Sequence, residues 1–364
     1  MAYIQEAFDT NWISPFGNNV DAFEKELEDL LDIPYATLTT SATAALHLAM
    51  VVLNVMPGDL VLVPTLTFAG CVNPVVYQGA TPVFVDSEPE TWNINPSLLR
   101  EAIENCIKKG KKPKALIMVH IYGVPAKVTE ILSICSEFEI PIVEDAADAL
   151  GSSYSGKKLG TFGTIGVISF NGNKIITTSG GGVFVSNQKE FVERAAFLGN
   201  QAKDDAPHYQ HSTIGYNYRM SNVLAGIGRG QLEVLADRVK SRRRVFEFYQ
   251  QALKNIPGFS SQAELLNGFA NRWLSAFKFD EGLASKMIAA LSEKNIECRP
   301  IWKPMHMQPV FSSSPGYIDG TAERIFNTGL CLPSGSLLPV NDQEMICEII
   351  YKVVNQTKST QIPI

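Results

Sequence analysis

Residues 140–182, IPIVEDAADALGSSYSGKKLGTFGTIGVISFNGNKIITTSGGG, hold two short apolar runs, PIVED and IGVISF, of the kind that forms buried strands. The first run ends in the carboxylates Glu144 and Asp145, and the second leads through Ser169 to Lys174. An acid and a lysine that follow two buried strands suit a pyridoxal phosphate enzyme, in which the lysine forms a Schiff base and the acid keeps the pyridine nitrogen protonated. Strand ends carry acids and lysines in many folds, so this spacing alone leaves other functions open.

Strand and helix patterns alternate on the N-terminal side of this stretch and predict an α/β fold. VLVP, TPVFVD and KALIMV are further candidates for buried strands, with helical patterns between them. Such alternation is typical of a mainly parallel sheet with right-handed crossovers, in which ligands bind beyond the carboxyl ends of the strands. A Thr/Ser cluster before the helical run AALHLAM is either an ordinary helix cap or a phosphate site, because the first amides of a helix are free.

The composition excludes several classes of protein. The formal charge of −6 argues against a nucleic acid as the main partner. No apolar run reaches the roughly 18–20 residues of a membrane span, and the first residues lack the pattern of a signal peptide. Six cysteines are scattered without a CxxC pair, which indicates reduced thiols, a cytoplasmic protein and no metal site.

The length of 364 residues allows two domains. We expect a large domain over residues 1–240 and a smaller α+β domain over residues 241–364, and leave open that the N-terminal segment packs with the small domain. Arginines on a helix near residues 238–244 are interpreted as a solvated helix face, and the last eight residues, TKSTQIPI, are predicted to fray.

Several segments together resemble the DegT/DnrJ/EryC1/StrS family of sugar aminotransferases. They include TSATAALHLAM, VPTLTFAGCVNPVVYQGATPVFVD, EDAADALGSSYSGKKLGTFG, ISFNGNKIITTSGGG, IGYNYRMSNVLAGIGRGQL and RPIWKPMH, and they follow the expected order over nearly the whole chain. The resemblance implies an aspartate aminotransferase-like fold (fold type I), with pyridoxal 5′-phosphate as the cofactor. By the same resemblance, Lys174 binds the cofactor covalently and is the catalytic base, Asp145 pairs with the pyridinium nitrogen, and Glu144 is structural.

The resemblance also assigns the remaining contacts to the cofactor. Phe68 is expected to stack on the pyridine ring, and Ala42, Thr43 and Ser169 to bind the phosphate. Asn217 resembles the family's asparagine that reaches the phosphate from the neighbouring subunit. This implies a homodimer with shared active sites.

Three features depart from the family pattern. Asp148 stands where many relatives carry Gln, a side chain that in the family lies near the cofactor's phenolic oxygen or the lysine. We therefore count Asp148 among the cofactor-binding residues and expect it to bind a cation or the substrate. Ala42 lies within Ser-Ala-Thr where many relatives have Ser-Gly-Thr, a change that backbone amides should tolerate. Relatives usually carry another short segment before the helix that leads into DTNWIS, and this sequence begins inside that helix. A substrate contact of the kind that the first residues of relatives could make is therefore left open.

The family acts mostly on nucleotide-linked keto sugars, with glutamate usually as the amino donor. The motifs are most similar to those of 4-aminotransferases that act on UDP-2-acetamido-4-keto-2,6-dideoxyhexose. GDP-4-keto-6-deoxymannose and a 3-keto sugar are the alternatives. The candidate substrate contacts are Trp12, Ser14, Arg299, Lys303 and His306, of which the cations suit a diphosphate.

Two other functions occur on the same fold. The sugar 3-dehydratases replace the cofactor lysine with histidine, and the lysine at position 174 argues against this class. A non-catalytic regulatory protein remains a distant alternative, because the full set of cofactor residues is present.

Overall fold

The computed structural model describes residues 1–360, without the side chains of 358–360. Its centre is an eight-stranded sheet in the order β1-β9-β8-β5-β4-β2-β3-β14. The strands are β1 (Tyr35–Thr39), β2 (Leu60–Pro64), β3 (Thr81–Val85), β4 (Ala115–Val119), β5 (Ile142–Asp145), β8 (Ile165–Ser169), β9 (Gly182–Ser186) and β14 (Gly316–Tyr317). Within this sheet only β9 runs opposite to the other strands, so the prediction of a mainly parallel sheet is confirmed.

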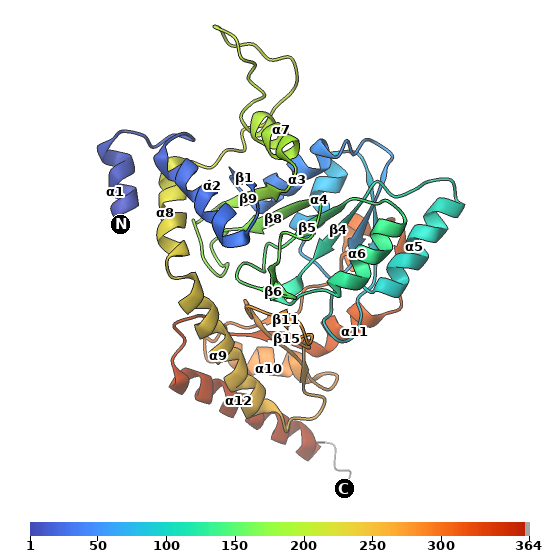
Figure 1. The fold of residues 1–364 in the computed structure, drawn as a ribbon. Coiled ribbons are helices and arrows are strands. Elements are labelled where there is room, and N and C mark those ends of the chain that lie inside the picture. The colour runs from blue at the N-terminus through green and yellow to red at the C-terminus, as the bar shows by residue number, and fades with distance from the viewer. Residues whose placement is uncertain (361–364) are drawn as a thin grey trace.

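Helices cover both faces of this sheet, which explains why its strands are almost continuously apolar. One face packs against helices α3 (Ala42–Val52), α4 (Ala69–Tyr77) and α7 (Lys189–Gly199). The other face packs against α2 (Asn18–Leu31), α5 (Pro96–Lys108) and α6 (Val128–Glu137). The sheet is therefore buried on both sides, and its carboxyl edge is where a ligand can enter (Figure 1).

A second, smaller core lies in the C-terminal part. Its four-stranded sheet has the order β10-β12-β15-β13, formed by β10 (Ser260–Ser261), β12 (Ser275–Lys278), β15 (Gly329–Leu332) and β13 (Arg299–Pro300). Helices α9 (Leu235–Leu253), α10 (Leu283–Ser292) and α12 (Val340–Thr360) pack on it, and α11 (Thr321–Thr328) and β14 lead back to the large sheet. A small sheet of β6 (Ser153–Tyr154), β7 (Lys157–Lys158) and β11 (Gly268–Phe269) joins the two parts.

The N-terminal helix α1 (Ala2–Asp9), whose packing was left open, lies on α8 (Asn222–Leu232) of the large part, where the Tyr3 hydroxyl donates to Glu233. Two details differ from the sequence-based expectations. The arginines of α9 are not all solvated, since Arg242 donates to the Trp273 carbonyl at 3.0 Å. Of the tail predicted to fray, the first four residues continue α12, and 361–364 lie outside the described residues. None of the described helices is long and apolar enough to cross a membrane.

Candidate active site

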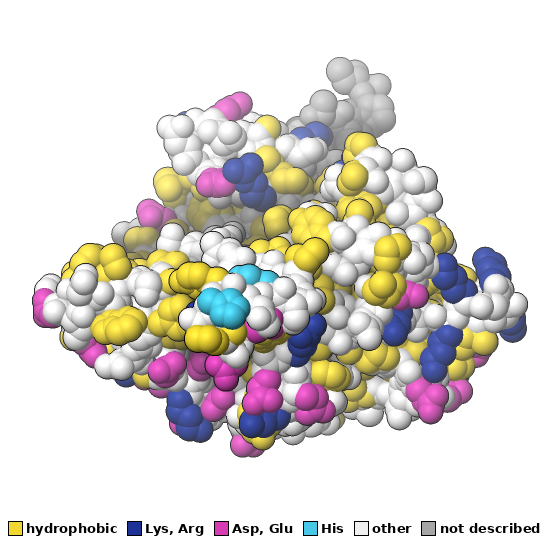
Figure 2. Space-filling model, turned by 90° about the horizontal axis from the view of Figure 1, so that it is seen from above, with side chains coloured by type: hydrophobic (Ala, Val, Ile, Leu, Met, Phe, Trp, Pro, Cys, Tyr) yellow, Lys and Arg dark blue, Asp and Glu magenta, His cyan; other side chains and the backbone are white. Residues whose placement is uncertain are grey.

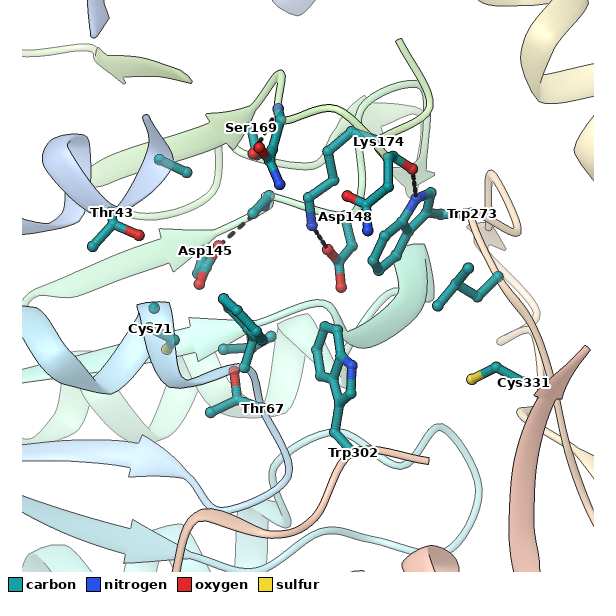
Figure 3. A pocket seen from close by; sticks show the side chains of 18 of the residues that line it. Thr43, Thr67, Cys71, Asp145, Asp148, Ser169, Lys174, Trp273, Trp302 and Cys331 are labelled. Atoms are coloured by element: carbon teal, nitrogen blue, oxygen red, sulfur yellow. Dashed lines mark hydrogen bonds and ion pairs between the residues drawn. The ribbon is translucent and has the colours of Figure 1, made fainter. Parts of the chain in front are cut away.

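A cavity of about 560 Å³ lies between the carboxyl edge of the large sheet and the C-terminal part. The large sheet contributes residues that follow its strands, among them Thr43, Phe68, Asp145, Ser169 and Lys174. The C-terminal part contributes Trp273, Trp302, Cys331 and Arg299. Figure 3 shows that the labelled side chains from both parts converge on one space.

The Lys174 side chain projects into this cavity from the loop after β8. Its Nζ donates to Asp148 Oδ1 at 2.5 Å and lies 4.0 Å from the centre of the Trp273 indole ring. The side chain is 12% exposed, so its amine is held in place and still reachable from the cavity. The indole nitrogen of Trp273 donates to the carbonyl of Asn173, which fixes the ring beside the lysine.

Asp145 lies at the end of β5 and is buried. Its Oδ1 accepts the N–H of Ala147 at 3.0 Å. Burial raises the pKa of Asp145 to about 6, the nearby Asp148 acts in the same direction, and the Ala147 N–H acts against it. A buried carboxyl of this kind is costly to ionise alone, so it fits a cationic partner such as a protonated ring nitrogen.

The opposite end of the cavity suits a phosphate. Ser41 caps α3 by accepting the N–H of Ala44 at 3.0 Å, and Ala42 and Thr43 begin the helix at the cavity wall. The first amides of a helix have no partner within it, and its dipole is positive there. Ser169, whose Oγ accepts the N–H of Asn171 at 3.2 Å, lines the same cavity.

An aromatic wall bounds the cavity. The Phe68 ring is 61% exposed and lies 5.6 Å from that of Trp302, measured between ring centres. The centre of the Tyr122 ring lies 4.8 Å from that of the Trp302 ring, and the Tyr122 hydroxyl accepts the backbone N–H of Trp302. Sequence reasoning missed Trp273 and Trp302 as cavity residues, although Trp302 lies within the quoted motif RPIWKPMH.

The prediction that Glu144 is structural agrees with its contacts. It is fully buried and accepts hydrogen bonds from His120 Nε2 at 2.8 Å and from the backbone N–H groups of Gly160 and Phe162 at 2.6 Å. Burial alone would raise the pKa of Glu144, but these bonds hold it below its ordinary value. Glu144 thereby anchors the 160–163 turn to β5.

The three candidate cations of RPIWKPMH, namely Arg299, Lys303 and His306, lie in different surroundings. Arg299 lines the cavity mouth, where Glu297 accepts from its Nε at 2.9 Å. Lys303 is exposed and does not line the cavity. His306 is bonded through Nδ1 to Thr65 Oγ1 at 2.6 Å and through Nε2 to Glu323 at 3.1 Å, so in this chain it links α11 to the loop after β2.

The remaining candidates lie outside the cavity of their own chain. The carbonyls of Trp12 and Ser14 accept from Asn222 at 2.6 and 2.8 Å. Asn217 is exposed and pairs with Asn200 at the base of the segment that projects beyond α7. A single chain therefore brings Ala42, Thr43, Phe68, Asp148 and Ser169 together with Lys174 and Asp145, and leaves Trp12, Ser14 and Asn217 apart.

Pyridoxal phosphate needs a lysine, an acid for its ring nitrogen, an anion site and a flat wall for its ring, and this cavity has a candidate for each. Together with the fold, these residues define the protein as a pyridoxal phosphate-dependent aminotransferase of fold type I. The chain belongs to the DegT/DnrJ/EryC1/StrS aminotransferase family, whose model matches residues 1–351.

Individual relatives agree with this class. The chain is 47% identical to the putative pyridoxal phosphate-dependent aminotransferase EpsN of Bacillus subtilis (strain 168), over 96% of this chain and 91% of the relative. It is 36% identical to the GDP-perosamine synthase of Escherichia coli O157:H7, over 96% and 93% of the two chains. A crystal structure of a DegT DnrJ EryC1 StrS aminotransferase from Brucella abortus superimposes with a TM-score of 0.91 at 27% identity, over 97% of this chain and 94% of the other.

Proposed function

We propose that this aminotransferase moves an amino group from glutamate to C4 of a nucleotide-linked 4-keto-6-deoxy sugar, for surface polysaccharide or glycan biosynthesis. The sugar substrate that we favour is UDP-2-acetamido-4-keto-2,6-dideoxyhexose. The observation that carries the transfer reaction is the position of Lys174, whose amine lies inside an open cavity next to the buried Asp145. Support for the sugar comes from the family and from the aromatic wall, a surface on which a sugar ring can pack.

In this proposal each residue of the cavity has a separate role. Bound pyridoxal phosphate supplies an electron sink that stabilises the charge left when the donor loses its α-proton. With the cofactor bound, Lys174 Nζ would take that proton, and Asp145 would keep the cofactor's ring nitrogen protonated. The start of α3 with Thr43 would hold the phosphate, and Phe68 would stack on the pyridine ring.

A second sugar is also supported. The likeness to GDP-perosamine synthases favours GDP-4-keto-6-deoxymannose as the alternative substrate. Both substrates present a 4-keto group on a nucleotide-linked 6-deoxy sugar, so the same proton transfers would serve either one. The choice between them depends on groups that meet the nucleotide and C2 of the sugar.

We also propose a homodimer whose subunits complete one another's cavities. Apolar side chains of the N-terminal segment are half exposed, namely Phe8, Trp12, Ile13 and Phe16, and those of the projecting segment, Tyr209 and Ile214, are over 80% exposed. Seen from the side of α7, hydrophobic side chains recur across the face in view (Figure 2). Burying such side chains against a second copy would stabilise a dimer and could bring Asn217 to the partner's phosphate site.

The reaction is tested with purified protein, glutamate and a panel of UDP-, GDP- and dTDP-linked keto sugars, with the product identified by mass spectrometry and NMR. We expect amination of the UDP sugar at C4. Preferential amination of the GDP sugar would overturn the favoured substrate. Turnover of none of the keto sugars would overturn the proposed function.

We also propose that the enzyme works in the cytoplasm, because all six cysteines are buried and unpaired, as is usual for proteins kept in a reducing environment.

A further inference from the structure

Asp148 is the residue to which Lys174 is bonded, and it is the acid that departs from the family pattern. Its Oδ1 lies 2.5 Å from Lys174 Nζ, and its side chain is only 6% exposed. The Trp273 ring covers the lysine amine from another side, 4.0 Å away. Figure 3 shows the dashed bond from the Lys174 amine to the Asp148 carboxylate, with the Trp273 ring beside the pair. The amine is therefore held both by a charge and by a ring face.

The backbone around Asp148 is shaped to hold its second oxygen. Oδ2 accepts the N–H of Tyr122 at 3.1 Å. Tyr122 has a φ of 56°, which is strained for a residue with a side chain, and Gly123 follows with a φ of 85°. A Cβ at Gly123 would collide with Asn271 Oδ1 and crowd the Asp148 carbonyl, so only glycine fits there. This turn points an N–H at the carboxylate, and strain of that kind is typical of functional sites.

A single side chain ties Asp148 to Trp273. Asn271 Nδ2 donates to the backbone carbonyl of Asp148 at 2.8 Å. Its Oδ1 accepts the backbone N–H of Trp273 at 2.9 Å. The carboxylate and the indole are therefore fixed relative to one another, although they come from different parts of the chain. The place that receives the lysine amine is preorganised.

We propose that Asp148 is a positioning residue that receives the Lys174 amine whenever the lysine is not attached to the cofactor, and so keeps it beside the reacting atoms between the two halves of the transfer. This rests on the proposed aminotransfer, in which the lysine must be released and reattached. A glutamine at this position could accept a hydrogen bond from the lysine, but it would carry no negative charge to attract the lysine's ammonium group. The acid therefore favours the released lysine more than the residue of many relatives would.

The test measures the reactivity of Lys174 and requires no sugar substrate. Full-length protein is loaded with pyridoxamine phosphate, which leaves the lysine free, and treated with an amine-acylating reagent. Peptide mass spectrometry then follows the acylation of Lys174, with exposed Lys254 as an internal standard. We expect Lys174 to react about tenfold faster in Asp148→Asn than in the wild type, because one charge-assisted bond no longer has to break first.

Two further variants make the result decisive. Asp148→Glu keeps the charge and should restore slow acylation. Asp148→Gln carries the residue of many relatives, so it should fold even if the asparagine variant does not, and should react as fast as Asp148→Asn. Equal rates for Lys174 in the wild type and in a folded amide variant would overturn the proposal. A failed sugar assay would leave these rates unchanged, so the two proposals fail separately.

Discussion

Asp145 and Lys174 share one cavity without bonding to each other. The Asp145 carboxyl accepts the Ala147 N–H at 3.0 Å, whereas the Lys174 amine donates to Asp148 at 2.5 Å. Among the described residues, Asp145 is therefore a buried acid with no cation bonded to it. Asp145 is therefore available to a cation that comes with the cofactor, as proposed above.

Asp145→Asn should weaken the reaction far more than the fold. An amide cannot hold the ring nitrogen in its protonated form, so we expect kcat to fall by about two to three orders of magnitude, the size typical of losing one preorganised electrostatic contact. Steady-state kinetics at saturating cofactor measure this loss. Asp59→Asn, which changes an acid outside the cavity lining, should keep wild-type turnover. A fully active Asp145→Asn enzyme would show that Asp145 has no role in the reaction.

The same residue predicts a pH dependence of the cofactor-free protein. The pKa of Asp145 is about 6 in the folded protein and about 4 in an unfolded chain, so the folded state binds this proton more tightly. The stabilisation that the bound proton gives to the folded state is fully present below about pH 4 and is lost as the pH rises through 6. At pH 7.5, cofactor-free Asp145→Asn should therefore be more stable than the wild type, by about 2–3 kcal/mol. The difference should vanish near pH 4. Thermal melting across this range checks the sign, and a variant less stable at pH 7.5 would contradict it.

Asp86 is predicted to be essential for stability rather than for chemistry. This buried carboxylate accepts the N–H groups of Gly320, Thr321 and Ala322 at 2.8, 3.1 and 3.0 Å, and so caps α11 against β3. Asp86→Ala leaves the amides of Gly320 and Ala322 without their side-chain acceptor, and should cost about 3 kcal/mol.

The control for this effect is a neighbouring acid. Asp319 is exposed and accepts one amide, that of Thr321, at 2.9 Å, so Asp319→Ala should cost about 1 kcal/mol. Urea unfolding of both variants provides the comparison. Equal losses for the two variants would show that burial of Asp86 has no special role.

Phe68→Ala should weaken cofactor binding and leave the stability of the cofactor-free protein nearly unchanged. The ring is 61% exposed in the cavity, so its removal costs the cofactor-free fold little, while the lost stacking of about 1 kcal/mol raises the Kd for pyridoxal phosphate about fivefold. Absorbance titration measures that Kd. Phe269→Ala, at a half-exposed ring outside the cavity, is the matched control and should leave the Kd unchanged. Unaltered affinity in Phe68→Ala would exclude a stacking role.

Shared active sites predict complementation between two inactive variants. Lys174→Ala removes the lysine from one chain, and Asn217→Ala removes the proposed contact to the partner's phosphate. Equal mixing and reassembly should return about a quarter of wild-type activity, since half of the dimers are mixed and each has one intact site. Activity assays after mixing, with size-exclusion chromatography, test this. No recovery in mixed dimers would argue that each chain builds its site alone.

The sequence was enough to predict features that depend on local residue patterns, such as the strands and the residues at their ends. Continuous apolar runs identified the buried strands, and the residues after them, Asp145 and Lys174, came to the same edge because parallel strands end together. For Asp148 the family resemblance implied a place near the cofactor or the lysine and a cation or the substrate as its partner, and in the structure the Lys174 amine is bonded to it. The Trp273 ring beside the lysine was not predicted, because its position depends on how the C-terminal part packs on the sheet. His306 was expected at the substrate, yet in this chain it is bonded to Thr65 and Glu323. Residue type alone could not distinguish these two roles.

Covalent trapping shows which lysine binds the cofactor. Protein incubated with pyridoxal phosphate is reduced with borohydride, digested and mapped by mass spectrometry. We expect one phosphopyridoxyl group, on Lys174, and neither that modification nor amino transfer in Lys174→Ala. A phosphopyridoxyl group on a different lysine, together with amino transfer by Lys174→Ala, would show that Lys174 is not the cofactor lysine.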